Sequence, residues 1–204
     1  EENGKTKLSY ARTSKYDNLL RYEGYELILK ILRYLYQIDA YISIAEVARE
    51  RGFVFAEALP LGGNILEIEG MFHPLIENAI PNSIQADAEH NVVFLTGANM
   101  AGKSTFMKTF GIVVYLAHMG FPLPVKKMRF SVQNGMYTTI NLPDNMMLGY
   151  SHFYAEVQRL KKVAEQVGRI GNLVIVFDEL FRGTNVKDAH EATLAVMEAF
   201  AEKK

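Results

Sequence analysis

The sequence predicts an α/β fold, a mainly parallel sheet flanked by helices and preceded by an α-helical segment. An apolar run of strand length, residues 92–95, leads directly into the glycine-rich stretch 97–104, and helical periodicity follows. A second apolar run, residues 173–177, has the composition of a buried strand in a parallel sheet and ends in two acids. The order strand, glycine-rich loop, helix is typical of a P-loop NTPase domain.

The N-terminal part is expected to be helical. Apolar residues recur at helical spacing from Leu19 to about Arg51, which predicts one long helix or two in succession. The stretch Leu-Pro-Leu-Gly-Gly at residues 59–63 has the composition of a linker. We therefore expect two parts, a helical segment of residues 1–58 and an α/β domain of residues 59–204.

The remaining elements follow from periodicity and turn residues. Gln-Asn-Gly at residues 133–135 predicts a tight hairpin turn that pairs strands 128–132 and 136–140. Gly120 closes the helix after the glycine-rich loop, and two glycines close a later helix. The expected strands are residues 65–69, 83–86, 92–95, 128–132, 136–140 and 173–177, and the expected helices are residues 104–119, 153–167 and 188 onward.

Bulk composition limits the function classes. The chain has 204 residues, a formal net charge of −1 and no cysteine, which excludes disulfides and thiolate metal sites. This charge balance gives no overall electrostatic reason for direct binding to nucleic acid or to an anionic membrane. No apolar run is long enough to span a bilayer, so no membrane partner is expected. A chain that starts at Glu1 and stops within a helical pattern is expected to be a piece of a longer protein.

The glycine-rich stretch is a candidate phosphate-binding loop. Its glycines allow successive N–H groups to point inward, and the following helix directs its positive end at the same place. Lys103 is placed to reach the β and γ phosphates, and the hydroxyl of Ser104 can bind Mg²⁺. The expected nucleotide-binding residues are Gly97, Ala98, Asn99, Met100, Ala101, Gly102, Lys103, Ser104 and Thr105.

The two acids after the second apolar run complete the predicted site. Asp178 is expected to bind or support Mg²⁺, which prefers hard oxygen ligands. Glu179 is expected to reach the water that attacks the γ phosphate, so Glu179 and Lys103 are the candidate catalytic residues. The histidines lack the spacing of metal ligands, so the only metal predicted is nucleotide-bound magnesium.

Three segments together resemble one family. Residues 96–105 are similar to its T-G-x-N-x-x-G-K-S-T loop, residues 149–156 to its G-x-S-x-F-x-x-E signature, and residues 178–184 to its D-E-x-x-R-G-T segment. The family is MutS, the DNA mismatch-repair ATPases of the ABC class. The resemblance runs from about residue 30 to the C-terminus, and it implies an ABC-type ATPase domain that uses ATP and Mg²⁺.

The resemblance also implies partners. In this family two ATPase domains face each other, so Ser151 would reach the γ phosphate bound by a second MutS-like subunit, most simply in a homodimer. The loop at residues 182–184 would couple the two sites. Residues 19–58 would be the last helices of a lever that joins the ATPase to a DNA clamp, and duplex DNA would be contacted by domains absent from this chain. A cytoplasmic location, in a bacterial cytosol or nucleoid, is implied as well.

Several positions depart from the family pattern. His152 follows the signature serine where Thr is common, Phe181 stands where Gly is common, and Ala101 replaces a frequent Gly. Ile84 occupies the region where an aromatic ring usually stacks on adenine, and it would pack against the base without π stacking. These departures indicate a divergent MutS-like branch.

Two alternatives stay open from the residues. One is another ABC-type DNA-maintenance ATPase, although the L-S-G-G-Q signature of that class is absent. The other is a nucleotide-gated interaction module that binds ATP without significant turnover. The Asp178-Glu179 pair favours hydrolysis over the module.

Overall fold

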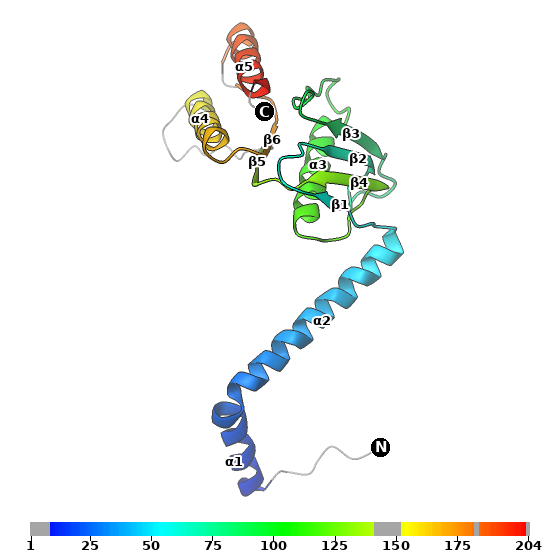
Figure 1. Ribbon diagram of the computed structural model, residues 1–204, viewed down its shortest axis with the longest axis vertical. Coiled ribbons are helices and arrows are strands. Elements are labelled where there is room, and N and C mark those ends of the chain that lie inside the picture. Colours follow the sequence, from blue (N-terminus) through cyan, green and yellow to red (C-terminus); the bar gives the residue numbers. More distant parts are fainter. Residues whose placement is uncertain (1–8, 141–151, 182–183, 203–204) are drawn as a thin grey trace. The chain divides into compact units, whose positions relative to one another are not determined.

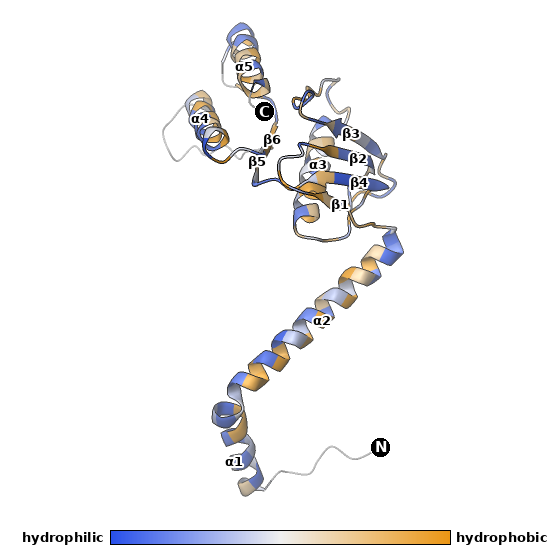
Figure 2. Ribbon diagram, in the orientation of Figure 1, coloured by the Kyte–Doolittle hydropathy of each residue, from blue (hydrophilic) through white to orange (hydrophobic). Residues whose placement is uncertain are grey.

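The computed structural model describes residues 9–140, 152–181 and 184–202, in two compact units divided between Val47 and Ala48. The first unit is helical (Figure 1), which the periodicity predicted from Leu19 onward but not for the preceding residues. It contains α1 (Tyr10–Asn18), a π-helical turn η1 (Leu19–Glu23) and α2 (Tyr25–Arg51), whose last residues belong to the second unit. None of the three has a buried residue, and Figure 2 shows hydrophobic residues recurring along α2.

The second unit is α/β, which confirms the coarse fold class. Its strands, as far as the described residues show, fall into one sheet of four and one of two. The elements in chain order are β1 (Glu57–Leu59), β2 (Leu66–Met71), β3 (Asn82–Ala86), α3 (Lys103–His118), β4 (Lys127–Ser131), β5 (Gly135–Thr139), α4 (His152–Ile170), β6 (Leu173–Phe177) and α5 (Val186–Ala201).

The four-stranded sheet has the order β1-β4-β2-β3. The β1–β4 pairing is parallel, whereas β2 pairs antiparallel with both β3 and β4. The sequence-based expectation of a mainly parallel sheet is therefore wrong for this sheet, which is mixed. Antiparallel strands can be joined by short connections, and β2 and β3 are linked by residues 72–81 without a crossover helix.

Helix α3 packs on one face of this sheet and forms the core with it. The sheet contributes every second residue of its strands and the helix contributes one face. This follows because side chains alternate between the two faces of a strand and recur about every 3.6 residues along a helix. Inside the core Val113 and Leu123 have no exposed surface. The buried cluster comprises Ile68, Met71, Phe110, Val113, Val114, Ala117, Leu123, Val125, Met128, Phe130 and Val176.

The opposite face of the sheet carries charged residues. Arg129 on β4 forms ion pairs with Glu57 at 3.1 Å and with Glu67 at 3.2 Å. Lys126 pairs with Glu69, and this hydrogen bond lowers the pKa of Glu69 and raises that of Lys126. Such alternation of apolar and charged residues is typical of a sheet with one solvated face.

The predicted hairpin between residues 128–132 and 136–140 is wrong. Strands β4 and β5 exist, but β5 pairs in parallel with β6, and Tyr137 lies opposite Ile175. Asn134 does not make the tight turn because it bonds elsewhere. Its side-chain amide donates to the carbonyls of Ile170 and Gly171 at 3.2 Å, and its backbone N–H donates to the carbonyl of Asn172 at 2.8 Å.

The predicted strand at residues 92–95 is also wrong. The stretch forms no strand, and its four side chains are 36–67% exposed. A strand needs backbone partners on a neighbouring strand, and within the described ranges none pairs with this run. Apolar composition alone therefore does not make this segment a strand.

The other predicted strands and helices are present, with bounds shifted by a few residues. Helix α3 starts at Lys103. The prediction that Gly168 closes the later helix is wrong, because α4 continues through Gly168 to Ile170. In α5 the N-cap is Asn185, whose side chain accepts a hydrogen bond from the N–H of Asp188 at 3.0 Å, so Asp188 is a first-turn acid. No helix in the described segments is long and apolar enough to cross a membrane.

Candidate nucleotide-binding site

The glycine-rich loop runs from the exposed segment 92–95 into the first turn of α3. Gly102 is the N-cap of α3 and has φ 92° and ψ 9°, a left-handed conformation that costs glycine little. Met100 also has a positive φ, 65°, and is fully exposed. The N–H of Ala101 donates to the carbonyl of Ala98 at 3.2 Å. The loop is thus a compact, solvent-facing turn at a helix N-terminus, where an anion is stabilised.

Lys103 folds back onto this loop. Its Nζ donates to the carbonyl of Gly97 at 2.6 Å and to that of Ala98 at 2.9 Å. A phosphate oxygen is a stronger acceptor for an ammonium group than a neutral carbonyl. The lysine is therefore held at the loop by bonds that a bound phosphate can replace.

Ser104 joins the loop to the end of β6. Its hydroxyl donates to a carboxylate oxygen of Asp178 at 3.2 Å, across 74 positions of sequence. Ser104 is in the first turn of α3, and Asp178 directly follows β6. The structure thus brings together the two residues that the sequence predicted as magnesium ligands.

These two oxygens fit a magnesium ion. Neighbouring ligands of octahedral Mg²⁺ lie about 2.9 Å apart when each bond is about 2.05 Å, which is close to the Ser104–Asp178 distance. Among the described residues no group of three or more His, Cys, Asp or Glu could hold a metal by itself. The remaining ligands would therefore be water and phosphate oxygens, as Mg²⁺ prefers.

Glu179 lies on a strained backbone beside Asp178. It has φ 46°, and Phe181 has φ 63°, a region that non-glycine residues rarely adopt and that often occurs at functional sites. Phe181 is only 3% exposed, and its ring lies 5.7 Å from that of Phe153 on α4. The glycine that is common in the MutS pattern at the position of Phe181 would adopt this φ without strain. The contact with the partly exposed Phe153 helps to bury the Phe181 ring, and this burial offsets the strain.

The other predicted site residues have different surroundings. Asn99 and Thr105 are exposed, whereas Lys103 and Ser104 are partly buried. Ile84 lies opposite Ile68 in the β2–β3 ladder and packs against the buried core. Ser151 and the Arg182-Gly183 part of the loop at 182–184 lie outside the described residues.

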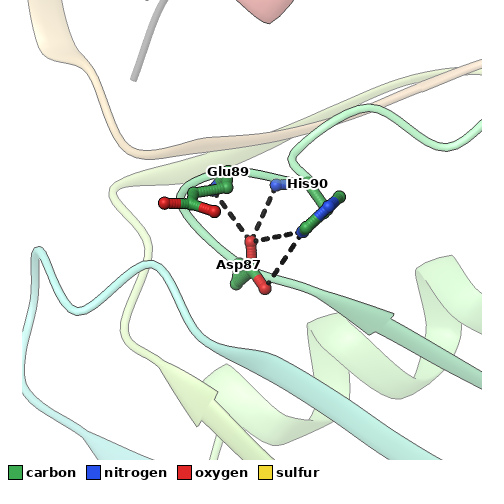
Figure 3. Close-up of polar contacts among 3 residues, drawn as sticks. All are labelled: Asp87, Glu89 and His90. Carbon is green, nitrogen blue, oxygen red and sulfur yellow. Dashed lines mark hydrogen bonds and ion pairs between the residues drawn. The ribbon is translucent and has the colours of Figure 1, made fainter.

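A tight turn precedes the segment that leads to the loop (Figure 3). The carboxylate of Asp87 accepts hydrogen bonds from the N–H groups of His90, at 2.7 Å, and Glu89, at 2.8 Å, and the ring of His90 lies 3.2 Å from it. These bonds, that of the His90 N–H foremost, lower the pKa of Asp87 below 3.8. The turn thus fixes the chain direction after β3 through one ionised carboxylate.

A small cavity lies beside the two acids and was not predicted. It is lined by residues of β5, α4 and the end of β6, among them Thr139, Glu156, Asp178 and Glu179. No sequence pattern indicated Thr139, because its place follows from the parallel β5–β6 pairing rather than from the expected hairpin. Glu156 ends the signature segment, and its residue type and position indicated no specific role.

Comparison with known proteins identifies the family. The family model described as MutS domain V matches residues 93–204, more than half of the chain. The chain belongs to the MutS family. The matched segment contains the glycine-rich loop, α3, the sheet β5–β6 and α5.

Individual MutS proteins are similar over most of the chain. The DNA mismatch repair protein MutS of Thermus aquaticus is 31% identical over 182 residues, 88% of this chain and 22% of that protein. MutS of Lactococcus lactis subsp. cremoris is 30% identical over 168 residues, 79% of this chain and 20% of that protein. MutS 1 of Halobacterium salinarum is 31% identical over 169 residues. The chain spans about a fifth of the length of these relatives.

Proposed function

We propose that this chain binds ATP with Mg²⁺ and hydrolyses it, as the ABC-type P-loop ATPase domain of a MutS-like DNA mismatch-repair protein. The Ser104–Asp178 hydrogen bond carries the proposal, because it joins the phosphate loop to the acidic end of β6. Membership of the MutS family supports it, since relatives of this chain are named DNA mismatch repair proteins.

Each site residue has a distinct task. When ATP binds, Lys103 Nζ leaves the carbonyls of Gly97 and Ala98 and donates to phosphate oxygens instead. Its positive charge then neutralises part of the negative charge of the phosphates. Ser104 and Asp178 hold Mg²⁺, which, when bound, neutralises phosphate charge and polarises the phosphoryl group. Glu179 accepts a proton from, or orients, the attacking water. The chemistry is phosphoryl transfer to water, which depends mainly on positioning and charge neutralisation.

The same proposal extends to the whole protein. Two subunits would pair so that Ser151 of one completes the site of the other, and turnover would move a DNA clamp through the helical segment. In this assignment residues 1–58 are the end of the lever and residues 59–204 the ATPase domain, and the protein acts on DNA in the cytoplasm. Ile84 would lie near the base, although its packing against the core leaves it little freedom to move.

Two substitutions test the assignment of roles. In Lys103→Ala we expect tight ATP binding to be lost, because the only loop lysine positioned by the carbonyls of residues 97 and 98 is gone. In Glu179→Gln we expect binding to persist and turnover to fall by roughly 10²-fold or more, the range for loss of a general base. Equilibrium ATP binding and single-turnover hydrolysis by the full-length protein, with and without mismatched duplex DNA, measure both.

The controls and outcomes separate the alternatives. Lys108→Ala, a change of an exposed lysine on the same helix, should leave binding unchanged. Stimulation of turnover by a mismatch supports repair, whereas turnover indifferent to DNA supports a different ABC-type role. Binding without turnover in the wild-type protein supports the interaction module, and undiminished hydrolysis by Glu179→Gln removes Glu179 from its role.

A further inference from the structure

The cavity beside Asp178 and Glu179 contains two buried polar atoms with unmet bonding capacity. Thr139 Oγ1 and Glu156 Oε2 are buried side-chain atoms without a hydrogen-bond partner, and both residues line this cavity. No other side-chain atom in the described segments shares this condition. The two atoms come from different elements, β5 and α4, both of which contribute to the lining of the cavity.

Leaving such atoms unbonded is costly. A buried hydroxyl or carboxylate that has lost its water and gained no partner is strongly unfavourable, so nearly all such groups in proteins bond to protein or to ordered water. A threonine hydroxyl can donate one hydrogen bond, and a carboxylate oxygen can accept one. The pair therefore has the complementary chemistry that one bridging molecule needs.

The cavity has room for that molecule. Its volume is about 30 Å³, and one water needs a cavity of at least about 10–15 Å³ together with two to four polar partners. We propose that the cavity binds one ordered water that bridges Thr139 Oγ1 and Glu156 Oε2, and that Glu156 thereby acts as a positioning residue for the Asp178–Glu179 segment. The water would tie α4 to β5, and Thr139 of β5 pairs with Phe177 at the end of β6.

The proposed bridge matters for turnover because of what else surrounds the cavity. The cavity is lined by Asp178, Glu179 and Leu180 as well as by Thr139 and Glu156, the two residues that would bind the water. Glu179 has φ 46°, and a strained conformation persists only when its surroundings hold it. The inference that Glu156 supports catalysis rests on the proposed ATPase function, whereas the water site itself does not.

Stability tests the water site independently of ATP. If Thr139 bonds a water, Thr139→Val removes that bond and should lower Tm by roughly 2–4 °C. If its hydroxyl is unbonded, the same change removes a buried unpaired group, and Tm should rise. Thr138→Val, at the exposed neighbouring position of β5, is the matched control and should change Tm little. A raised Tm in Thr139→Val would overturn the water site.

A double-mutant cycle tests whether both side chains bind the same water. Glu156→Ala alone should lower Tm, and adding Thr139→Val should lower it by less than the sum of the two changes, because the shared water is already lost. Additive shifts would overturn the bridge. Glu165→Ala, an exposed glutamate on the same helix, controls for loss of a carboxylate. Thr139→Ser keeps the hydroxyl and should retain the wild-type coupling.

Kinetics test the positioning role. Thr139→Val and Glu156→Ala should each lower kcat roughly tenfold, the scale for loss of a supporting hydrogen bond, and should leave the KM for ATP unchanged. Unchanged kcat in both variants would overturn the role of Glu156, even if the water is present. Absence of ATP hydrolysis in the wild-type protein would instead overturn the proposed function and leave the stability cycle intact. A crystal structure showing no water within 3.5 Å of both atoms would refute the site directly.

Discussion

Phe181 shows how a single residue can retain a glycine-like conformation. Its φ of 63° is unfavourable for a residue with a Cβ atom, yet its side chain is almost completely buried and contacts the ring of Phe153. The packing gain of a buried aromatic ring, about 3–5 kcal/mol, exceeds a backbone strain of about 1–3 kcal/mol. The phenylalanine therefore stabilises the segment after the two acids despite the strain.

This balance predicts an unusual order of stabilities. Phe181→Ala and Phe181→Gly both lose the ring, but only glycine also relieves the positive φ, so we expect Phe181→Gly to be the more stable of the two by about 1 kcal/mol. Urea unfolding of both variants measures the difference. At Val163, buried in the middle of α4, the order should be reversed, because glycine is the poorer helix former by about 1 kcal/mol. Greater stability of the alanine variant at position 181 would contradict the strain argument.

At the level of single residues, the sequence predicted the chemical roles of side chains better than their contacts in the folded protein. The pairing of Ser104 with Asp178 followed from residue type and motif order, and the structure confirms their proximity. The fold-back of Lys103 onto two carbonyls was not predictable, because it depends on the loop's own backbone geometry. Thr139 and the cavity were missed for a similar reason, since only the strand register places them.

Among the elements, helices were predicted more reliably than strand pairings. A helix forms its hydrogen bonds within itself, so the apolar period locates α3, α4 and α5 to within a few residues. A strand forms its hydrogen bonds with a neighbouring strand, and the apolar period does not predict which strand that is. The Asn134-Gly135 pair favoured a local hairpin, but Asn134 bonds to the turn between α4 and β6, and β5 pairs with β6. Tertiary contacts thus determined which strands pair.

The turn after β3 has a pH dependence that follows from its hydrogen bonds. Because the pKa of Asp87 is lowered in the folded protein, its stabilising effect is complete above its unfolded pKa of about 3.9 and is lost as the pH falls through the folded value, which lies below 3.8. We expect NMR titration to find this pKa lowered in the wild type. In His90→Ala most of the lowering should remain, because the backbone N–H of residue 90 still donates. A return to the ordinary pKa in His90→Ala would show that the imidazole, not the backbone, causes the shift.

For the molecule as a whole, the site depends on parts that are far apart in sequence. The glycine-rich loop lies at the start of α3 and the two acids follow β6, so neither segment forms the proposed site alone. Val176 of β6 belongs to the same buried core as α3, which places both segments in one packed unit. The family match over residues 93–204 includes both. The central claim is that these two segments form a single site for Mg²⁺ and ATP.

Magnesium-dependent ATP binding tests this claim most directly. Equilibrium binding of ATP should be measured with and without Mg²⁺ for the wild type, Ser104→Ala, Asp178→Asn and the double variant. We expect Mg²⁺ to strengthen binding by the wild type, each single change to reduce that strengthening roughly tenfold, and the double variant to lose little more, because both residues act on one ion. Equal strengthening by Mg²⁺ in all four proteins would contradict a shared site.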